Sequence, residues 1–260
     1  MSTGITFHLM VRDEPLTYYA ARSIYPIADR IILRDTGTTD SLSLRSIAEL
    51  LAADKRAEKK IDAKVIRIPD ERGYDMFSHA SKRALQARTA GNLNKAVVRQ
   101  RMLAETRTPF FFVVDGDEIY EEASLPAIAE AARSWPQGKI MGHVSYLRLC
   151  ETRRCWSSAI VGRLFPTATT RLGNQTPGEK GWGRVGNKWV ALHSGDMRRG
   201  FMIPRARFWH YSAVLKPWRV VHRPAETKRD LTLALPIVTR ENAKLWKACC
   251  DRMEGYPRGG

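Results

Sequence analysis

Residues 110–120 read FFFVVDGDEIY, and this stretch decides how the chain is organised. Its first five residues are apolar, which is typical of a strand buried on both faces of a sheet. Three carboxylates, Asp115, Asp117 and Glu118, follow immediately. Like charges at one point repel each other, so this acidic cluster at the end of a buried strand needs a compensating charge.

Other strands of the chain are also followed by polar clusters. Strand patterns cover residues 5–11, 30–34, 63–68, 110–114 and 140–149, and helical patterns begin at Pro15 and cover residues 44–51 and 96–106. This alternation predicts an α/β fold with a mostly parallel sheet flanked by helices. Ligands bind at the carboxyl ends of such strands, so we expect a site where residues 12–14, 35–40 and 115–118 meet.

Positive charge is concentrated in the second half of the chain. Residues 139–223 contain 16 Lys and Arg but only three acidic residues, a difference of +13, and five of the tryptophans. Such a surface attracts polyanions, namely nucleic acid, an anionic membrane face or an acidic glycan, although a charge that only keeps the protein soluble is the simpler interpretation. Beyond residue 150 we expect long loops and short strands, and a last helix over 240–253.

Composition excludes several classes of protein. No run of about 18 apolar residues is present, so no transmembrane helix is expected. The N-terminus lacks the pattern of a signal peptide, and the four cysteines do not form a disulfide framework. We therefore expect a cytoplasmic protein, or one in the host cytoplasm if the chain is viral.

The acidic cluster is suited to a divalent cation. Asp115 and Asp117 are two residues apart and point the same way in an extended chain, and Gly116 lets the backbone approach a ligand. Two carboxylates at one point favour Mg²⁺ or Mn²⁺, which would in turn bind a diphosphate. The alternative interpretation is a solvated acidic turn.

Several motifs, in order, resemble family 2-type glycosyltransferases of the GT-A fold. They cover roughly residues 4–220 and read MVRDEP at 10–15, IILRDTGTTD at 31–40, VRQ at 98–100, the acidic stretch itself, GRLFP at 162–166 and FWHYSAVLKP at 208–217. Haloacid-dehalogenase-type phosphatases also carry Asp-x-Asp after an apolar strand, but they place Thr or Val where this chain has Ile119. The resemblance implies a nucleotide-sugar-binding half over 1–138, an acceptor-binding half over 139–223 and a helical tail over 224–260, within one continuous domain.

The resemblance also implies roles for single residues, with a UDP-hexose as the donor. Asp35 would contact the nucleotide base beside the backbone of Val11 and Arg12, and Arg99 would lie near the ribose or diphosphate. Mn²⁺ or Mg²⁺ would be held by Asp117 and Asp115, with Asp115 also near the donor. His210 could complete the metal shell or could be a packed core histidine. Lys216 and Arg219 could bind the diphosphate by charge.

An inverting transferase needs a base that deprotonates the acceptor hydroxyl. Our candidates are Asp196 and Glu179, which are carboxylates in the basic half. The chain lacks the clear Glu-Asp pair or His-Glu that the family usually has at the base position, so a retaining mechanism stays open.

The acceptor is expected to bind the basic half. Phosphate contacts come from Lys and Arg, and an extruded base can stack on aromatic side chains, for which Trp182 and Trp189 are candidates beside Arg184. We therefore expect DNA with hydroxymethylated bases, which some bacteriophages glycosylate. Lipid-linked or lipopolysaccharide glycans at a membrane surface are the alternative, and a non-catalytic nucleic-acid-binding module is the alternative from another class.

Overall fold

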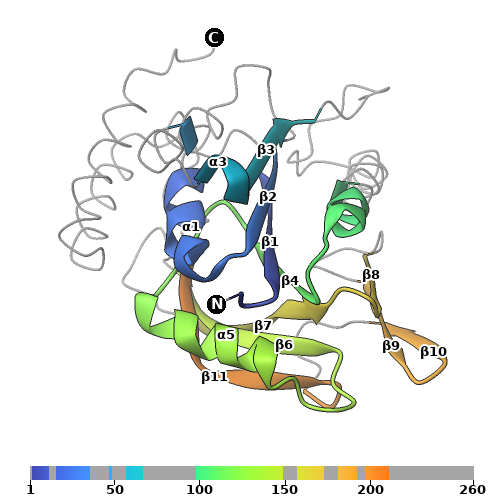
Figure 1. The fold of residues 1–260 in the computed structure, drawn as a ribbon. Helices are drawn as coiled ribbons and strands as arrows, with labels where there is room; N and C mark the ends of the chain where they lie inside the picture. The colour runs from blue at the N-terminus through green and yellow to red at the C-terminus, as the bar shows by residue number, and fades with distance from the viewer. Residues whose placement is uncertain are drawn as a thin grey trace, which may run out of the picture.

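The structure is a computed structural model that describes residues 2–11, 16–35, 47–48, 57–66, 98–148, 157–172, 181–191 and 197–210. Within these ranges the chain forms an eight-stranded sheet in the order β3-β2-β1-β4-β7-β6-β11-β5 (Figure 1). A separate three-stranded sheet has the order β10-β9-β8. No helix in the described part of the chain is long and apolar enough to cross a membrane.

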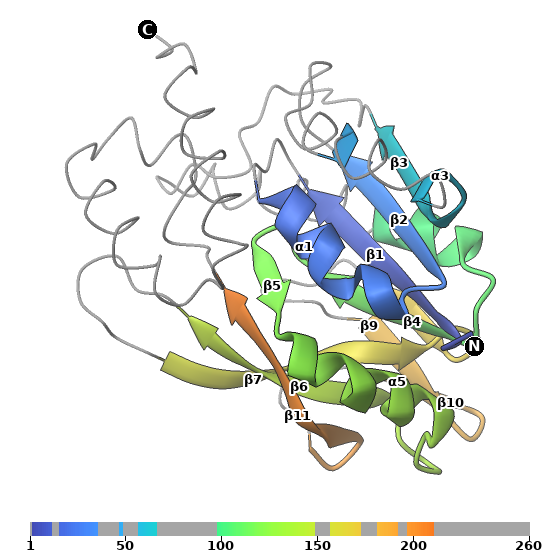
Figure 2. The same ribbon diagram turned by 60° about the vertical axis from the view of Figure 1, so that its left-hand side comes forward.

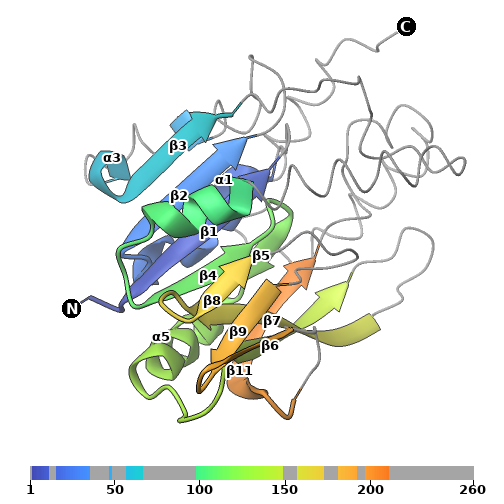
Figure 3. The same cartoon turned by 90° about the vertical axis from the view of Figure 1, so that its right-hand side faces the viewer.

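The first half of the large sheet is parallel. It contains β1 (Ile5–Val11), β2 (Arg30–Asp35), β3 (Ile61–Val65) and β4 (Phe110–Val114), and β1 lies between β2 and β4. The arrows of β1, β2 and β3 point the same way in Figure 3, so these strands end at one edge of the sheet. The predicted bounds of β1 and β4 are confirmed, and β3 begins two residues earlier than predicted and ends at Val65.

The second half of the large sheet is mixed. It contains β5 (Glu118–Tyr120), β6 (Met141–Arg148), β7 (Ser157–Pro166) and β11 (Gly200–His210). Strand β7 is antiparallel to both β4 and β6, whereas β11 is parallel to β6 and antiparallel to β5. The predicted mostly parallel α/β sheet is therefore confirmed, with antiparallel pairs added beyond β4.

Long strands after residue 150 were not expected, and the prediction of loops and short strands was wrong for β7 and β11. The reason in β11 is a bulge, because its pairing with β6 shifts register between Met202 and Arg207. Arg205 lies within this bulge at a φ of 62°. An inserted residue breaks the period-two alternation by which a strand is recognised in a sequence.

Helices cover both faces of the sheet. On one face lie α1 (Thr17–Ile24) and α5 (Leu125–Arg133), and α5 runs beside β6 and β11 (Figure 2). The other face is covered by the helical residues 98–105, which pack through Leu103 on Phe111 and Val113. Alternate β4 side chains, Phe112 and Val114, belong to the core beneath α1 and α5. The flanking helices predicted for an α/β fold are thus confirmed.

Short helical turns complete the described elements, namely η1 (Tyr25–Ile27), α3 (Ala57–Lys60) and η2 (Glu122–Ser124). Residues 47–48 are helical, as predicted for 44–51, and the other residues of that segment lie outside the described ranges. The helix expected over 240–253 also lies outside them.

The three-stranded sheet contains β8 (Thr170–Leu172), β9 (Gly181–Val185) and β10 (Lys188–Ala191), all antiparallel. One of its faces packs against the main body of the protein. A Cβ at Gly183 would lie 2.8 Å from Cβ of Ile140, so only glycine fits there without movement. Val190 packs on the cluster that contains Ile140, and Thr170 is buried.

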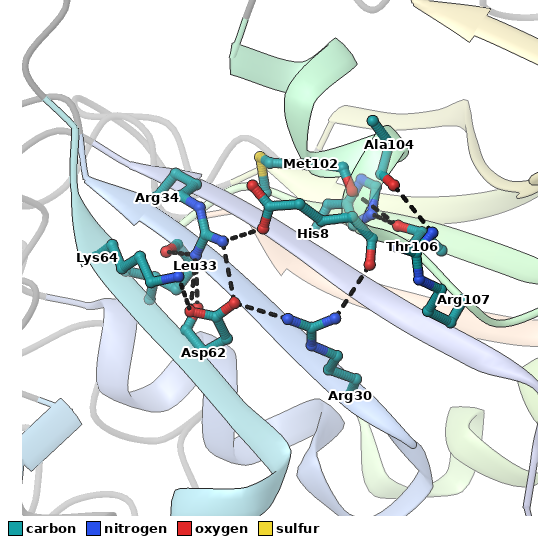
Figure 4. Close-up of polar contacts among 11 residues, drawn as sticks. His8, Arg30, Leu33, Arg34, Asp62, Lys64, Met102, Ala104, Thr106 and Arg107 are labelled. Atoms are coloured by element: carbon teal, nitrogen blue, oxygen red, sulfur yellow. Dashed lines mark hydrogen bonds and ion pairs between the residues drawn. The ribbon is translucent and has the colours of Figure 1, made fainter.

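A charged network connects β2 and the edge strand β3 to the helical residues 98–105 (Figure 4). Arg34, whose side chain is 2% exposed, donates hydrogen bonds to Asp62 on β3 and to Glu105. Arg30 donates to the same Asp62 carboxylate at 2.7 Å and to the Glu105 carbonyl at 3.0 Å. Burial would raise the pKa of Asp62, but hydrogen bonds from Arg34 and from Lys64 lower it to about 2.

His8 on β1 is buried beneath the same helical residues. Its Nε2 lies 2.7 Å from the Thr106 hydroxyl oxygen, and that hydroxyl donates to the Met102 carbonyl at 2.9 Å. The hydroxyl must therefore accept from His8, so the network assigns the imidazole proton to Nε2. The ring stacks on Phe111 at 4.8 Å. Burial, and then the nearby Arg99, lower the pKa of His8 to about 3.

The depressed pKa of His8 predicts acid sensitivity of the fold. The unfolded chain protonates His8 below about pH 6.5, whereas the folded chain does so only near pH 3. The free energy of unfolding should therefore fall as the pH drops through this window, at up to about 1.4 kcal/mol per pH unit from this residue. His8→Phe should give a correspondingly flatter dependence between pH 6 and 4 in urea titrations. Equal slopes for the two proteins would contradict the assignment.

Candidate functional site

The candidate site lies where the central parallel strands end. Val11 pairs with Asp35 at the ends of β1 and β2, and Asp115 follows the end of β4 on the other side of β1. Neighbouring strands are about 4.8 Å apart, so the ends of β2 and β4 are separated by about 10 Å. Asp35 is fully buried and Val11 is nearly so. Val11, Asp35 and Asp115 thus lie near one edge of the sheet, whereas residues 12–14 and 36–40, which were also predicted to meet there, lie outside the described ranges.

A tight turn connects β4 to β5 and carries the acidic cluster. The Glu118 N–H donates to the Asp115 carbonyl at 3.1 Å, which closes the turn. Strand β5 then pairs with β11, so that Glu118 lies opposite His210. This pairing brings His210 to Asp117, with 3.5 Å between Nε2 and Oδ1. The Asp117 side chain is 7% exposed and that of His210 is 22% exposed, so both are shielded from bulk water.

Asp115 faces two arginines instead. Its Oδ2 accepts from Arg163 on β7 at 3.1 Å, and its Oδ1 lies 3.4 Å from Nη2 of Arg99. The Asp115 side chain is 37% exposed, so it is the most accessible of the three carboxylates. Arg99, predicted to lie near the ribose or diphosphate, is thus placed at the end of β4.

Two residues of the site had no role in the sequence analysis. Glu118 is fully buried and pairs with Arg163, whose side chain is 5% exposed. The second carboxylate oxygen of Glu118, Oε2, accepts from the Asp115 N–H at 3.2 Å and from the Tyr120 hydroxyl at 3.4 Å. The signals in the sequence were the third carboxylate of the acidic stretch and the arginine of GRLFP.

Asp117 and His210 fit a divalent cation by their chemistry. A carboxylate oxygen and an imidazole nitrogen 3.5 Å apart are donors that Mn²⁺ accepts, and the carboxylate also suits Mg²⁺. The described ranges contain no group of three or more His, Cys, Asp or Glu side chains that could hold a metal ion. Two protein ligands do not fill the coordination shell of Mg²⁺ or Mn²⁺, so the pair would leave positions for other oxygen ligands, such as those of a phosphate.

Several predicted site residues lie outside the described ranges. These are Arg12, Glu179, Asp196, Lys216 and Arg219, and their roles stay predictions. Trp182 is part of β9, where it pairs with Arg171 and Ala191 along the backbone.

The three-stranded sheet brings Arg184 and Trp189 together, and their role in binding an acceptor stays a prediction. These two residues are directly opposite each other in the β9–β10 pair. The guanidinium of Arg171 lies 4.2 Å from the centre of the Trp189 ring, which is a cation–π contact. Trp189 is 36% exposed. We call Arg171, Arg184 and Trp189 the basic aromatic surface.

A hydrogen bond connects this sheet to the helix of the candidate site. The Leu172 N–H donates to Oε1 of Gln100 at 3.1 Å, and Gln100 is the neighbour of Arg99. Since Leu172 follows Arg171 in β8, the basic aromatic surface and the acidic turn share this helical segment as a common support.

Comparison with known proteins gives distant structural matches. No protein-family model and no curated protein matches the chain. Glucosyl-3-phosphoglycerate synthase from Mycobacterium tuberculosis, solved with Mn²⁺, UDP and phosphoglyceric acid, is 20% identical with a TM-score of 0.32, over 55% of this chain and 43% of that one. The same synthase with Mn²⁺ and UDP-glucose is 19% identical with a TM-score of 0.33, over 56% and 43%.

TarS from S. aureus is 14% identical with a TM-score of 0.29, over 57% of this chain and 22% of that one. The chain thus spans less than half the length of either protein. Similarity this distant does not identify a reaction or a substrate, which have to be inferred from the site itself.

The buried pair of Glu118 and Arg163 predicts a large effect on stability. Glu118→Ala leaves a buried guanidinium without its buried partner, which typically costs about 3–5 kcal/mol, so the free energy of unfolding should fall by about 3 kcal/mol. Glu130→Ala is the matched control, because its pair with Arg133 is exposed and contributes below about 1 kcal/mol. Urea titrations at pH 7 measure both variants. Similar losses in the two would contradict the assignment.

Proposed function

We propose that the protein is a metal-dependent glycosyltransferase that uses a nucleotide-sugar, UDP-hexose, as its donor. The observation that carries this proposal is the pair of Asp117 and His210 at the end of β4, with Asp35 and Val11 at the ends of the adjacent strands. The motifs that resemble family 2-type glycosyltransferases lie on these same elements. The nucleotide would bind near Asp35 and Val11, and the diphosphate near Asp117.

In the proposed reaction, the acceptor oxygen forms a bond to the anomeric carbon of the sugar. The bond from that carbon to the diphosphate breaks, and UDP leaves with the bonding electrons. Mn²⁺ or Mg²⁺, when bound, would supply stabilisation of the negative charge on the diphosphate. Asp117 and His210 would hold the cation, and Arg99 would place a positive charge beside them.

The acceptor hydroxyl loses its proton in this reaction and needs a base. Asp196 and Glu179 remain our candidates in the basic half, and Lys216 and Arg219 remain candidates for the diphosphate. We leave the stereochemical outcome open.

For the acceptor we propose DNA that carries hydroxymethylated bases. Two observations support a polyanion: the charge difference of +13 over residues 139–223, and the basic aromatic surface, where Arg171 stacks on Trp189. Arginine and lysine would bind phosphates, and an exposed indole would stack on a base. Trp182, Arg184 and Trp189 are the proposed acceptor-binding residues.

A transfer assay tests donor and acceptor together. The protein is incubated with Mn²⁺, UDP-sugars and DNA with or without 5-hydroxymethyl bases, and the DNA is digested to nucleosides for mass measurement. A hexose added only to hydroxymethylated nucleosides would support the proposal. UDP release without any nucleoside shift would point to another acceptor, such as a lipid-linked glycan. DNA binding without UDP release would indicate a non-catalytic module.

Asp117→Asn tests the cation-binding role of the turn. The amide keeps the shape of the side chain but loses the charge that attracts Mn²⁺, so we expect Mn²⁺-dependent transfer to fall at least about 100-fold. DNA affinity should not change. Glu130→Gln, the same chemical change at an exposed position on α5, should behave as the unaltered protein. Retained transfer in Asp117→Asn would rule out the metal assignment.

The basic aromatic surface predicts two distinguishable effects on DNA binding. Trp189→Ala should weaken binding by about 1–3 kcal/mol through loss of base stacking. Arg184→Ala should reduce the slope of log affinity against log salt by about 1, through loss of one phosphate contact. Binding isotherms at 50–200 mM salt measure both effects. Arg133→Ala, an exposed change on α5, serves as control, and equal behaviour of all three variants would contradict the proposal.

A further inference from the structure

The acidic turn is closed by a buried side chain as well as by its backbone. Besides the backbone bond from Glu118 to Asp115, the Asp115 N–H donates to Oε2 of Glu118 at 3.2 Å. The Glu118 carboxylate is fully buried, so it contacts the turn from within the protein. The position of Asp115 and Asp117 therefore depends on where the Glu118 carboxylate is held.

Arg163 holds that carboxylate. Its Nη2 donates both to Oε1 of Glu118 and to Oδ2 of Asp115, so one guanidinium spans the first and last residues of the turn. The guanidinium also lies 5.6 Å from the centre of the Phe208 ring on β11. Strand β11 ends at His210, so Arg163 contacts both segments that carry the candidate cation ligands.

The three carboxylates of the turn contact different partners. Asp115 and Glu118 are paired with Arg163, and Asp115 also with Arg99, whereas Asp117 faces His210. The positive charges of Arg163 and Arg99 compensate the carboxylates of Asp115 and Glu118. The contact of Asp117 with His210 thus lies next to the contacts by which Arg163 holds Asp115 and Glu118.

We propose that Arg163 is a positioning residue that, through Glu118, sets the geometry in which Asp117 and His210 bind a divalent cation. The identity of the cation rests on the proposed function. Lysine is not an equivalent replacement, because its compact ammonium lacks the planar guanidinium that lies over the Phe208 ring while one of its nitrogens donates to both carboxylates. Arg163→Lys therefore keeps the positive charge and removes the planar guanidinium, which separates the effect of charge from the effect of side-chain geometry.

The test measures Mn²⁺ binding directly, with the full chain and Mn²⁺ as the only probe, by electron paramagnetic resonance of the free ion. Loss of a residue that orients metal ligands typically lowers metal affinity 10–100-fold, so we expect about a 10-fold loss in Arg163→Lys and also in Arg163→Met. Circular dichroism at the same temperature verifies that each variant is folded. Glu118→Gln, which keeps the volume of the side chain, replaces them if neither arginine variant folds, and should also bind Mn²⁺ more weakly.

Each other outcome overturns the proposal. If Arg163→Lys binds Mn²⁺ as the unaltered protein does, the geometry of the guanidinium has no role. If Arg163→Met binds Mn²⁺ more tightly, Arg163 competes with the cation by charge. If unfolding is easier but Mn²⁺ affinity is unchanged, its role is structural. If the unaltered protein binds no Mn²⁺, the proposed function fails as well, whereas the first three outcomes leave that function intact. Arg133→Lys on α5 should change nothing.

Discussion

Strand β4 must be buried on both faces, and the rest of the sheet depends on that burial. Phe112 and Val114 pack into the core under α1 and α5, while Phe111 and Val113 pack under the helical residues 98–105. The same strand is parallel to β1 on one edge and antiparallel to β7 on the other. Because β4 is the junction of the parallel and mixed halves, residues from both halves meet at its end.

Placing three carboxylates at that junction costs free energy unless positive charge is close. The protein supplies it from β7 and from the helical residues 98–105, with Arg163 and Arg99. An arginine suits this position because it stays protonated and donates to two carboxylates at once. These two arginines thus offset the repulsion between neighbouring carboxylates that the sequence of the turn implies.

Local signals explain which parts of the fold could be predicted. Strand β4 is a continuous apolar run and β1 is mostly apolar, and both are followed by polar residues, so their bounds were found correctly. Strand β11 could not be found, because its bulge at Arg205 breaks the alternation and its pairing with β6 joins residues far apart in the chain. Helix α5 was also not predicted, although its apolar side chains pack on the core from one side.

In the candidate site, too, local patterns in the sequence revealed some residues but not the contacts between them. Asp115 and Asp117 were recognisable from two-residue spacing after an apolar strand, and His210 from a resemblance of motifs. The contact between Asp117 and His210 arises only because β5 pairs with β11, which no local pattern encodes. The pairing of Arg163 with Glu118 likewise depends on β7 lying beside β4. Residue types could be predicted, but partners could not, because partners are set by the order of strands in the sheet.

The contacts of the helical residues 98–105 fix the position of Arg99 in the candidate site. Residues four apart share a helix face, so Val98 and Met102 both pack on Ile32, whereas Arg99 and Leu103 lie toward β4. Beyond them, Glu105 accepts from Arg34 and Thr106 from His8. Rotating this segment by one residue would break these contacts together, so the position of Arg99 beside Asp115 is fixed by the whole set of contacts and not by their ion pair alone.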